Sequence, residues 1–241
     1  MPDTNPIPRD CVVFDTETTG LDPHNGDRIV EIGAVRMLDG LPTHETFHRH
    51  INPERRVPDN AVKVHGLTTE FLEDKPLFRD IIDDFLNFIA DRPLVAHNAG
   101  FDADFLNTEL DRHGRTAIGA DRFIDTVPIA RRKLPGQKVS LDALCRKFKI
   151  SLDSRNKHGA LIDSELLAEV CVELNGGRQG TLFAPAEPET DHDTPGTQHR
   201  AVEIETFVRQ ASEEEMRAHA EMVARIPNAL WNNFEPYASQ Q

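Results

Sequence analysis

Residues 11–20, CVVFDTETTG, decide how the rest of the chain is interpreted. Residues 11–14 are apolar and mostly β-branched or aromatic, so a short buried strand is predicted over residues 11–15. Because side chains alternate along a strand, Asp15 and Glu17 share one face, with Cα atoms about 7 Å apart. Two carboxylates placed in this way can chelate a metal ion, although a lone Asp-x-Glu also occurs by chance in exposed acidic turns.

The pattern around this strand predicts an α/β fold. Residues 28–38 and 43–51 have strand character and short connections, which favours antiparallel neighbours. From residue 60 the apolar residues recur at a spacing of three to four, which indicates helices. Strands before helices and brief strands between them indicate a mixed sheet flanked by helices. The expected helices are 62–66, 68–74, 78–90, 101–114, 127–133, 140–150 and 160–175, and further strands are expected at 93–97 and 122–126.

Further carboxylates occur in otherwise apolar segments. Asp102 follows the predicted strand 93–97 at the start of a helix, where the helix dipole favours an anion. His158 precedes the helix 160–175 and Asp163 lies in its first turns, so that both can face one point. Buried carboxylates repel one another, and a divalent cation such as Mg²⁺ relieves this repulsion with hard oxygen ligands. Each residue alone also has an ordinary interpretation as a helix-end anion or a solvated loop residue.

Composition excludes some classes of function. The chain has 41 acidic and 27 basic residues, a net charge of -14, which argues against a generic nucleic-acid coating protein. Cys11, Cys145 and Cys171 lie far apart in apolar stretches, so we expect buried reduced thiols. The first ten residues lack a signal pattern, and no run approaches the roughly 18 apolar residues of a membrane span. We therefore expect a cytoplasmic protein without a membrane partner.

Three motifs together resemble those of the DEDDh exonuclease superfamily: FDTETTG (14–20), HNAGFDADFL (97–106) and HGALID (158–163). The resemblance implies an RNase H-like fold with a mixed five-stranded sheet, two Mg²⁺ or Mn²⁺ ions per site, and release of 3′-terminal nucleotides as monophosphates. By motif, the metal ligands are Asp15, Glu17, Asp102 and Asp163, and the general base is His158, whose unperturbed pKa of about 6.5 suits proton transfer.

The same resemblance suggests substrate contacts. They are Thr18, His65, His97, Asn98 and Phe101. For His97 and Phe101 a packing role is equally compatible, because aromatic rings beside a strand usually pack. A further set of histidines, at positions 44, 48 and 50, alternates on a strand that we expect to be exposed, and we assign it no function.

The C-terminal part divides into a linker and a tail. Residues 1–177 are predicted to form the nuclease domain, and residues 178–200 a flexible linker rich in Pro, Glu, Asp and Thr. RQGTLF (178–183) resembles the peptide by which bacterial replication proteins bind the sliding clamp, with Gln179 as the polar contact and Leu182 and Phe183 in an apolar pocket. Residues 201–241, expected to be largely disordered alone, resemble the polymerase-binding tail of the epsilon-type proofreading subunits of bacterial DNA polymerase III.

These resemblances predict a 3′-to-5′ DNA exonuclease that proofreads for the replicative polymerase. The expected partners are the polymerase (alpha) subunit, the sliding clamp, single-stranded 3′ DNA ends and, as a further candidate, a small third core subunit. One alternative is a free-standing DEDDh exonuclease in DNA repair or RNA end trimming. Another is an inert assembly module, against which the presence of all five active-site residue types argues.

Overall fold

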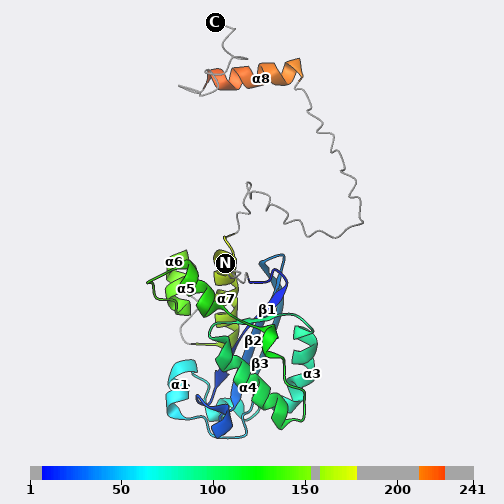
Figure 1. Cartoon of the computed structure of the whole chain (residues 1–241), viewed down its shortest axis with the longest axis vertical. Coiled ribbons are helices and arrows are strands. Elements are labelled where there is room, and N and C mark those ends of the chain that lie inside the picture. The colour runs from blue at the N-terminus through cyan, green and yellow to red at the C-terminus, as the bar shows by residue number, and fades with distance from the viewer. Residues whose placement is uncertain (1–6, 153–157, 178–211, 226–241) are drawn as a thin grey trace, which may run out of the picture. The chain divides into compact units, whose positions relative to one another are not determined.

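The computed structural model describes residues 7–152, 158–177 and 212–225. The chain divides into two units, residues 1–184 and residues 185–241, each of which is described here by itself (Figure 1). The predicted linker 178–200, with its clamp motif, lies outside the described residues, as does most of the tail. Within the tail, the helix α8 (Glu213–Ala224) is described.

The first unit is built on a mixed sheet of five strands. They are β1 (Cys11–Thr18), β2 (Ile29–Leu38), β3 (Leu41–His50), β4 (Leu94–Ala96) and β5 (Phe123–Asp125), in the order β3-β2-β1-β4-β5. The pairs β1–β2 and β2–β3 are antiparallel, whereas β1–β4 and β4–β5 are parallel. The predicted fold class is thus confirmed, and β1, which carries the first motif, is the central strand.

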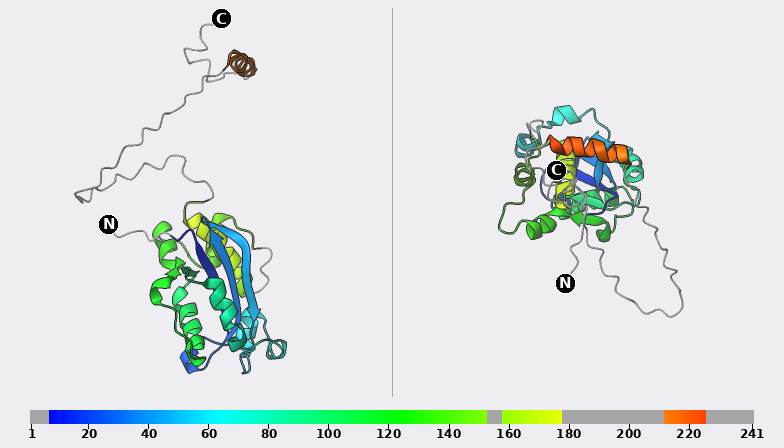
Figure 2. Two further views of the ribbon diagram at one scale, coloured as in Figure 1. Left: turned by 90° about the vertical axis from the view of Figure 1, so that its right-hand side faces the viewer. Right: turned by 90° about the horizontal axis from the view of Figure 1, so that it is seen from above.

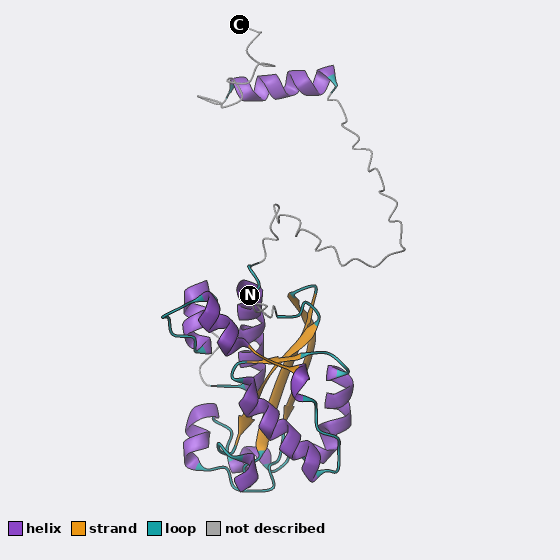
Figure 3. Cartoon of the chain, in the orientation of Figure 1, coloured by secondary structure: helices purple, strands orange, loops and turns teal. Residues whose placement is uncertain are grey.

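Helices connect and cover the strands (Figure 3). Thr68 and Ser140 accept hydrogen bonds from backbone N–H groups at the starts of α2 and α6, as helix-capping side chains do. The helices are α1 (Asp59–His65), α2 (Thr69–Leu72), α3 (Phe78–Ile89), α4 (Ala99–Arg112), α5 (Thr126–Lys133), α6 (Leu141–Phe148) and α7 (Ala160–Leu174), with 3₁₀ turns at Pro23–Asn25 and Ala120–Arg122.

Helices lie on both faces of the sheet (Figure 2), and a buried apolar cluster lies on each face. Val12 and Phe14 of β1 belong to the cluster that includes α3 and α4, whereas Cys11 and Val13 belong to the cluster that includes α6 and α7. This alternation is the period of two that a central strand requires when both of its faces are buried. Asp15 therefore continues the face that looks toward α7.

Several predicted boundaries differ from the structure by one to three residues, and three of them bear on the site. The strand expected over 11–15 continues to Thr18, because Glu17 and Thr18 still pair with β2, so both carboxylates of the first motif lie inside the strand. The helix expected from residue 101 begins at Ala99, after a left-handed Asn98. The strand expected over 122–126 ends at Asp125, whose side chain caps α5 by accepting a hydrogen bond from the Val127 N–H.

The cysteine prediction is confirmed, because the three thiols are free and buried. Burial raises the pKa of Cys11 to about 12 and that of Cys145 to about 11. Within the described part of the chain, no helix combines the length and the apolar character needed to cross a membrane.

Candidate active site

The carboxylates of the three motifs come from separate elements that meet at β1. Asp15 and Glu17 lie on β1, Asp102 lies in the first turn of α4, and Asp163 lies in the first turn of α7. Glu17, Asp102 and Asp163 are each at most 8% exposed. Four acidic side chains, three of them nearly buried, thus converge from segments that are far apart in sequence.

Asp102 is held against β1 by Thr16. Its Oδ1 accepts hydrogen bonds from the Thr16 backbone N–H (3.1 Å) and from the Thr16 hydroxyl (2.7 Å). Sequence reasoning missed Thr16. Its position between Asp15 and Glu17 was the available signal, since alternation turns it to the opposite face of the strand, where α4 packs.

His158 lies beside Asp163 at the start of α7. Its Nδ1 is 3.0 Å from Asp163 Oδ2, and its side chain is 51% exposed, so the ring can reach solvent. Glu17, His158 and Asp163 each offer a ligand atom within 4.8 Å of those of the other two. This grouping is compact enough to hold a metal ion.

The electrostatics of the cluster favour a cation. The pKa of Asp15 is raised well above its ordinary range, first by burial and then by the charges of Asp102, Glu17, Asp163 and Glu31. Burial also raises the pKa of Asp102 to about 7, although the Thr16 hydrogen bonds oppose this shift. Without a counter-charge these carboxylates repel one another, and a divalent ion with hard oxygen ligands removes that cost. The donor set therefore fits the divalent metal that the resemblance of the three motifs implies.

The start of α7 is fixed to β2 by contacts that the sequence did not reveal. Glu31 Oε2 accepts a hydrogen bond from the Ala160 N–H (3.1 Å), and the Ser164 hydroxyl donates to the carbonyl of Gly33 (2.8 Å). A Cβ on Gly33 would lie 2.1–2.4 Å from backbone atoms of Ala160 and Leu161. A glycine inside a strand often marks such a close backbone approach, which was the unused signal.

Two predicted substrate residues, Thr18 and His65, lie in the first motif and in helix α1. Thr18 is buried at the end of β1, and its hydroxyl donates to the carbonyl of Gly20 (2.6 Å). His65 is buried in the last turn of α1, where its Nδ1 accepts from the Leu67 N–H (3.0 Å). These local contacts hold the turns that follow β1 and α1.

Of the other three, His97 and Asn98 lie between β4 and α4, and Phe101 lies in the first turn of α4. His97 Nδ1 is 2.8 Å from the hydroxyl of Thr126, and burial lowers the pKa of His97. The Asn98 N–H donates to Asp125 (3.0 Å), a residue that the sequence reasoning did not single out. The ring of Phe101 packs against that of Phe105, with centroids 4.8 Å apart. Phe101 thus makes a packing contact, and His97 makes a polar one.

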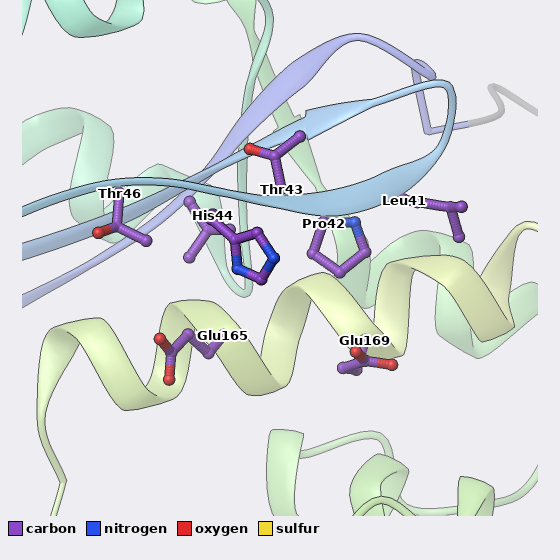
Figure 4. A pocket seen from close by; sticks show the side chains of 8 residues that line it. Leu41, Pro42, Thr43, His44, Thr46, Glu165 and Glu169 are labelled. Carbon is purple, nitrogen blue, oxygen red and sulfur yellow. The ribbon is translucent and has the colours of Figure 1, made fainter.

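A hollow of about 480 Å³ lies elsewhere, between β3 and α7 (Figure 4). Neither His158 nor any of the four motif carboxylates lines it. The carboxylate cluster, and not this hollow, is therefore the candidate active site. The lining residues are Val35, Leu41, Pro42, Thr43, His44, Thr46, Glu165 and Glu169.

Comparison with known proteins places this geometry in context. The exonuclease family model RNase_T matches residues 12–171. The DNA polymerase III subunit epsilon of Rickettsia felis is 47% identical over 219 residues, 89% of this chain and 96% of the relative. The same subunit of Salmonella typhimurium is 40% identical over 223 residues, covering 86% and 89%.

Solved structures give the same fold. Exonuclease X in complex with 5′ overhanging duplex DNA superposes with a TM-score of 0.55 and 28% identity, covering 68% of this chain and 90% of that one. The nuclease domain of 3′hExo, a DEDDh family member bound to rAMP, has a TM-score of 0.58 and 20% identity, covering 69% and 91%.

Proposed function

Because this chain belongs to the exonuclease family and, within it, to the DNA polymerase III epsilon subunits, we propose that Asp15, Glu17, Asp102 and Asp163 are its metal ligands and His158 its general base. The chain is a 3′-to-5′ DNA exonuclease of the proofreading kind. The predicted family, fold and enzyme class are confirmed, and a free-standing or inert role has no comparable support.

One observation carries the residue assignment. Four carboxylates from β1, α4 and α7 and one imidazole come together where burial raises the pKa values of Asp15 and Asp102, and where the charges of the other carboxylates raise that of Asp15 further. A structural cluster of acids would be costly to maintain in this way without a cation. A metal-dependent site explains why these acids are buried together.

The chemistry follows from the positions of the residues. Divalent ions, when bound, neutralise the carboxylates and polarise the scissile phosphodiester. The Asp163 carboxylate faces His158 Nδ1 and orients the ring, so that Nε2 accepts the proton of the attacking water. Thr16 holds Asp102 in place through two hydrogen bonds to one carboxylate oxygen. We propose two ions, Mg²⁺ or Mn²⁺, and the substrate contacts Thr18, His65, His97, Asn98 and Phe101.

The test is release of nucleoside monophosphate from a 3′-labelled single strand with Mg²⁺ or Mn²⁺. His158→Ala should lower kcat by roughly 10²- to 10⁴-fold, the usual contribution of a general base, and Asp102→Ala should abolish most activity. Asp104→Ala is the matched control, because Asp104 lies two residues further along α4 with a side chain 48% exposed. Equal rates for the wild type, His158→Ala and Asp102→Ala would overturn the assignment.

The preference for mismatched ends follows from how readily an unpaired 3′ end reaches the active site. A mispaired 3′ end costs less to unpair than a matched end, so it reaches the site more often without being read base by base. Membership of the epsilon subunits implies association with the polymerase III core and with DNA. Such tethering raises the local concentration of the nuclease at the primer end, so this acidic chain needs little affinity of its own for DNA.

The finer partner assignments are also proposals. We propose that residues 201–241 bind the polymerase (alpha) subunit, that Gln179, Leu182 and Phe183 bind the sliding clamp, and that a small third subunit completes the core in the cytoplasm. Leu182→Ala with Phe183→Ala should abolish retention on immobilised clamp while leaving nuclease activity on free single strands unchanged. Undiminished retention would contradict the clamp assignment.

A further inference from the structure

A second group of ligand-type side chains lies where β2 and β3 pair. Glu31 and His50 are cross-strand partners, and His48 lies two residues before His50 on the same face of β3. Glu31 Oε1 is 2.6 Å from His48 Nε2 and 3.4 Å from His50 Nε2. The ligand atoms of all three residues lie within 4.8 Å of one another.

The carboxylate of Glu31 is divided between two tasks. Its Oε1 faces the two imidazoles, while its Oε2 accepts the hydrogen bond from the Ala160 N–H at the start of α7. A ligating carboxylate whose other oxygen is hydrogen-bonded is the usual arrangement at metal sites, because the second contact fixes the orientation of the ligand. Glu31 is 4% exposed, so its position is set by the fold.

We propose that Glu31, His48 and His50 form a binding site for one zinc-like divalent cation, separate from the carboxylate cluster of the active site. Two imidazoles and one carboxylate are the ligand set that Zn²⁺ takes with three protein ligands, its fourth position held by water. Mg²⁺ prefers oxygen ligands throughout, so the two sites differ in the metal that they select.

The geometry requires little change. Zinc bonds of about 2.0–2.1 Å at tetrahedral angles place ligand atoms about 3.3 Å apart. The Glu31–His50 distance of 3.4 Å already matches, and the Glu31–His48 distance of 2.6 Å must open by about 0.7 Å. The His48 side chain is 35% exposed and can make that adjustment.

Protonation and packing also suit a ligand set. The pKa of His50 is lowered, chiefly by burial, which leaves its ring neutral with a lone pair at neutral pH. The pKa of Glu31 is lowered as well: burial opposes this shift, but the hydrogen bonds from His48 and from the Ala160 N–H outweigh it. Phe71 packs edge-on against His50, with ring centroids 5.1 Å apart, and restrains that ring.

A neighbouring histidine provides the matched control. His44 lies on the same strand and the same face, but beside Glu165 and Glu169 in the hollow between β3 and α7 (Figure 4). His44→Ala therefore removes one imidazole from β3 without touching the proposed ligands.

The experiment measures zinc bound per full-length chain by equilibrium dialysis in excess Mg²⁺, which occupies the active-site carboxylates. The wild type, His44→Ala and His158→Ala should bind one zinc equivalent more than the His48→Ala, His50→Ala double variant. Each single variant, His48→Ala or His50→Ala, should bind this zinc more weakly than the wild type. The loss of affinity should exceed the roughly 10- to 100-fold that removal of an outer hydrogen-bonding partner costs.

Two outcomes would overturn the site. Equal zinc content in the wild type and the double variant would show that Glu31, His48 and His50 form a hydrogen-bonded group that binds no zinc. Loss of the same equivalent in His158→Ala would assign that zinc to the active site. The His48→Gln, His50→Gln pair, with circular dichroism to verify folding, provides the same comparison with side chains of similar volume. Nuclease activity in Mg²⁺ is independent of this result, so failure here leaves the proposed function standing.

Discussion

Asp102 shows how a single carboxylate is prepared for a cation. It is 3% exposed, yet one of its oxygens receives both the N–H and the hydroxyl of Thr16. The hydrogen bonds favour the charged form and burial disfavours it, and burial prevails, because the pKa rises to about 7. A residue in this balance is suited to bind a divalent ion at neutral pH, and it is partly protonated there when no ion is present.

This balance predicts how the stability of the metal-free protein depends on pH. With the folded pKa of Asp102 at about 7 and the unfolded value near about 3.9, the folded state binds the extra proton. The Asp102 contribution to the free energy of unfolding is therefore largest at low pH and is lost as pH rises toward and through about 7. Urea unfolding in a chelator, compared with Asp102→Asn, isolates this contribution.

In that comparison Asp102→Asn should have the larger free energy of unfolding at pH 8 without metal. With Mg²⁺ present, the wild type should have the larger value. A difference between the two proteins that does not change with pH would contradict the raised pKa of Asp102.

At the scale of elements, α7 must approach β2 closely for Asp163 to reach the site. Gly33 permits the approach, and the Ser164 hydroxyl, which lies within hydrogen-bond distance of the carbonyls of both Gly33 (2.8 Å) and Ala160 (2.7 Å), ties the helix to the strand. The position of His158 at the helix start depends on a further contact between α7 and β2, because the Ala160 N–H is held by the carboxylate of Glu31.

Gly33→Ala should therefore lower both stability and nuclease activity. The added methyl group would meet backbone atoms of α7, and overpacking of this kind costs about 1–3 kcal/mol. Gly100→Ala is the control, since nothing lies within 4 Å of a Cβ there and alanine favours the α4 helix by up to about 1 kcal/mol. Thermal unfolding and the single-strand assay measure both variants, and an unimpaired Gly33→Ala would contradict the packing argument.

Helix α4 is anchored by a buried ion pair. Arg28 donates two hydrogen bonds to Glu109, at 2.6 and 3.0 Å, and the Glu109 side chain is 1% exposed. Glu109→Ala would remove the close, buried partner of Arg28 and leave the longer contact with Glu54, at 3.9 Å, so we expect a loss of up to about 3–5 kcal/mol in the free energy of unfolding.

The surface pair Arg115–Asp83, with side chains 44% and 71% exposed, is the control for that variant. Asp83→Ala should cost less than about 1 kcal/mol, because exposed pairs are screened by solvent. Urea denaturation of both variants gives the comparison, and similar losses would show that burial of the Glu109 pair is unimportant.

At the scale of the whole molecule, the proposed catalytic residues and the proposed polymerase-binding residues lie in different parts of the chain. The proposed catalytic residues lie in the first unit, while the second contains α8, on which Met216 and Met222 are exposed. Exposed apolar side chains on a helix are suited to a protein partner. This arrangement is consistent with our proposal that residues 201–241 bind the polymerase subunit.

Truncation after residue 177 should separate these tasks. The shortened chain should degrade free single-stranded DNA at a rate within about twofold of the wild type but lose co-purification with the polymerase subunit, because tethering contributes local concentration and not chemistry. Met216→Asp with Met222→Asp in the full chain tests the contact without deletion. Retained binding in both proteins would place the polymerase contact elsewhere.

Particular residues show how far the sequence alone reached. The apolar runs set the order of strands and helices, and the helices expected from residues 68 and 140 begin directly after the capping residues Thr68 and Ser140, because capping is a local interaction. The three motifs named five candidate site residues, and the structure brings them together. Element boundaries were less secure, since β1 reaches Thr18 only through its pairing with β2.

The sequence by itself determined which side chains are candidates for the chemistry and which faces of the elements are buried, because periodicity and local hydrogen bonding act over a few residues. The tertiary structure alone decided how those side chains are held. Thr16 meets Asp102 across 86 positions, and Glu31 meets Ala160 across 129. No local pattern encodes such contacts, since they exist only after the sheet has formed and α4 and α7 have packed against its two faces.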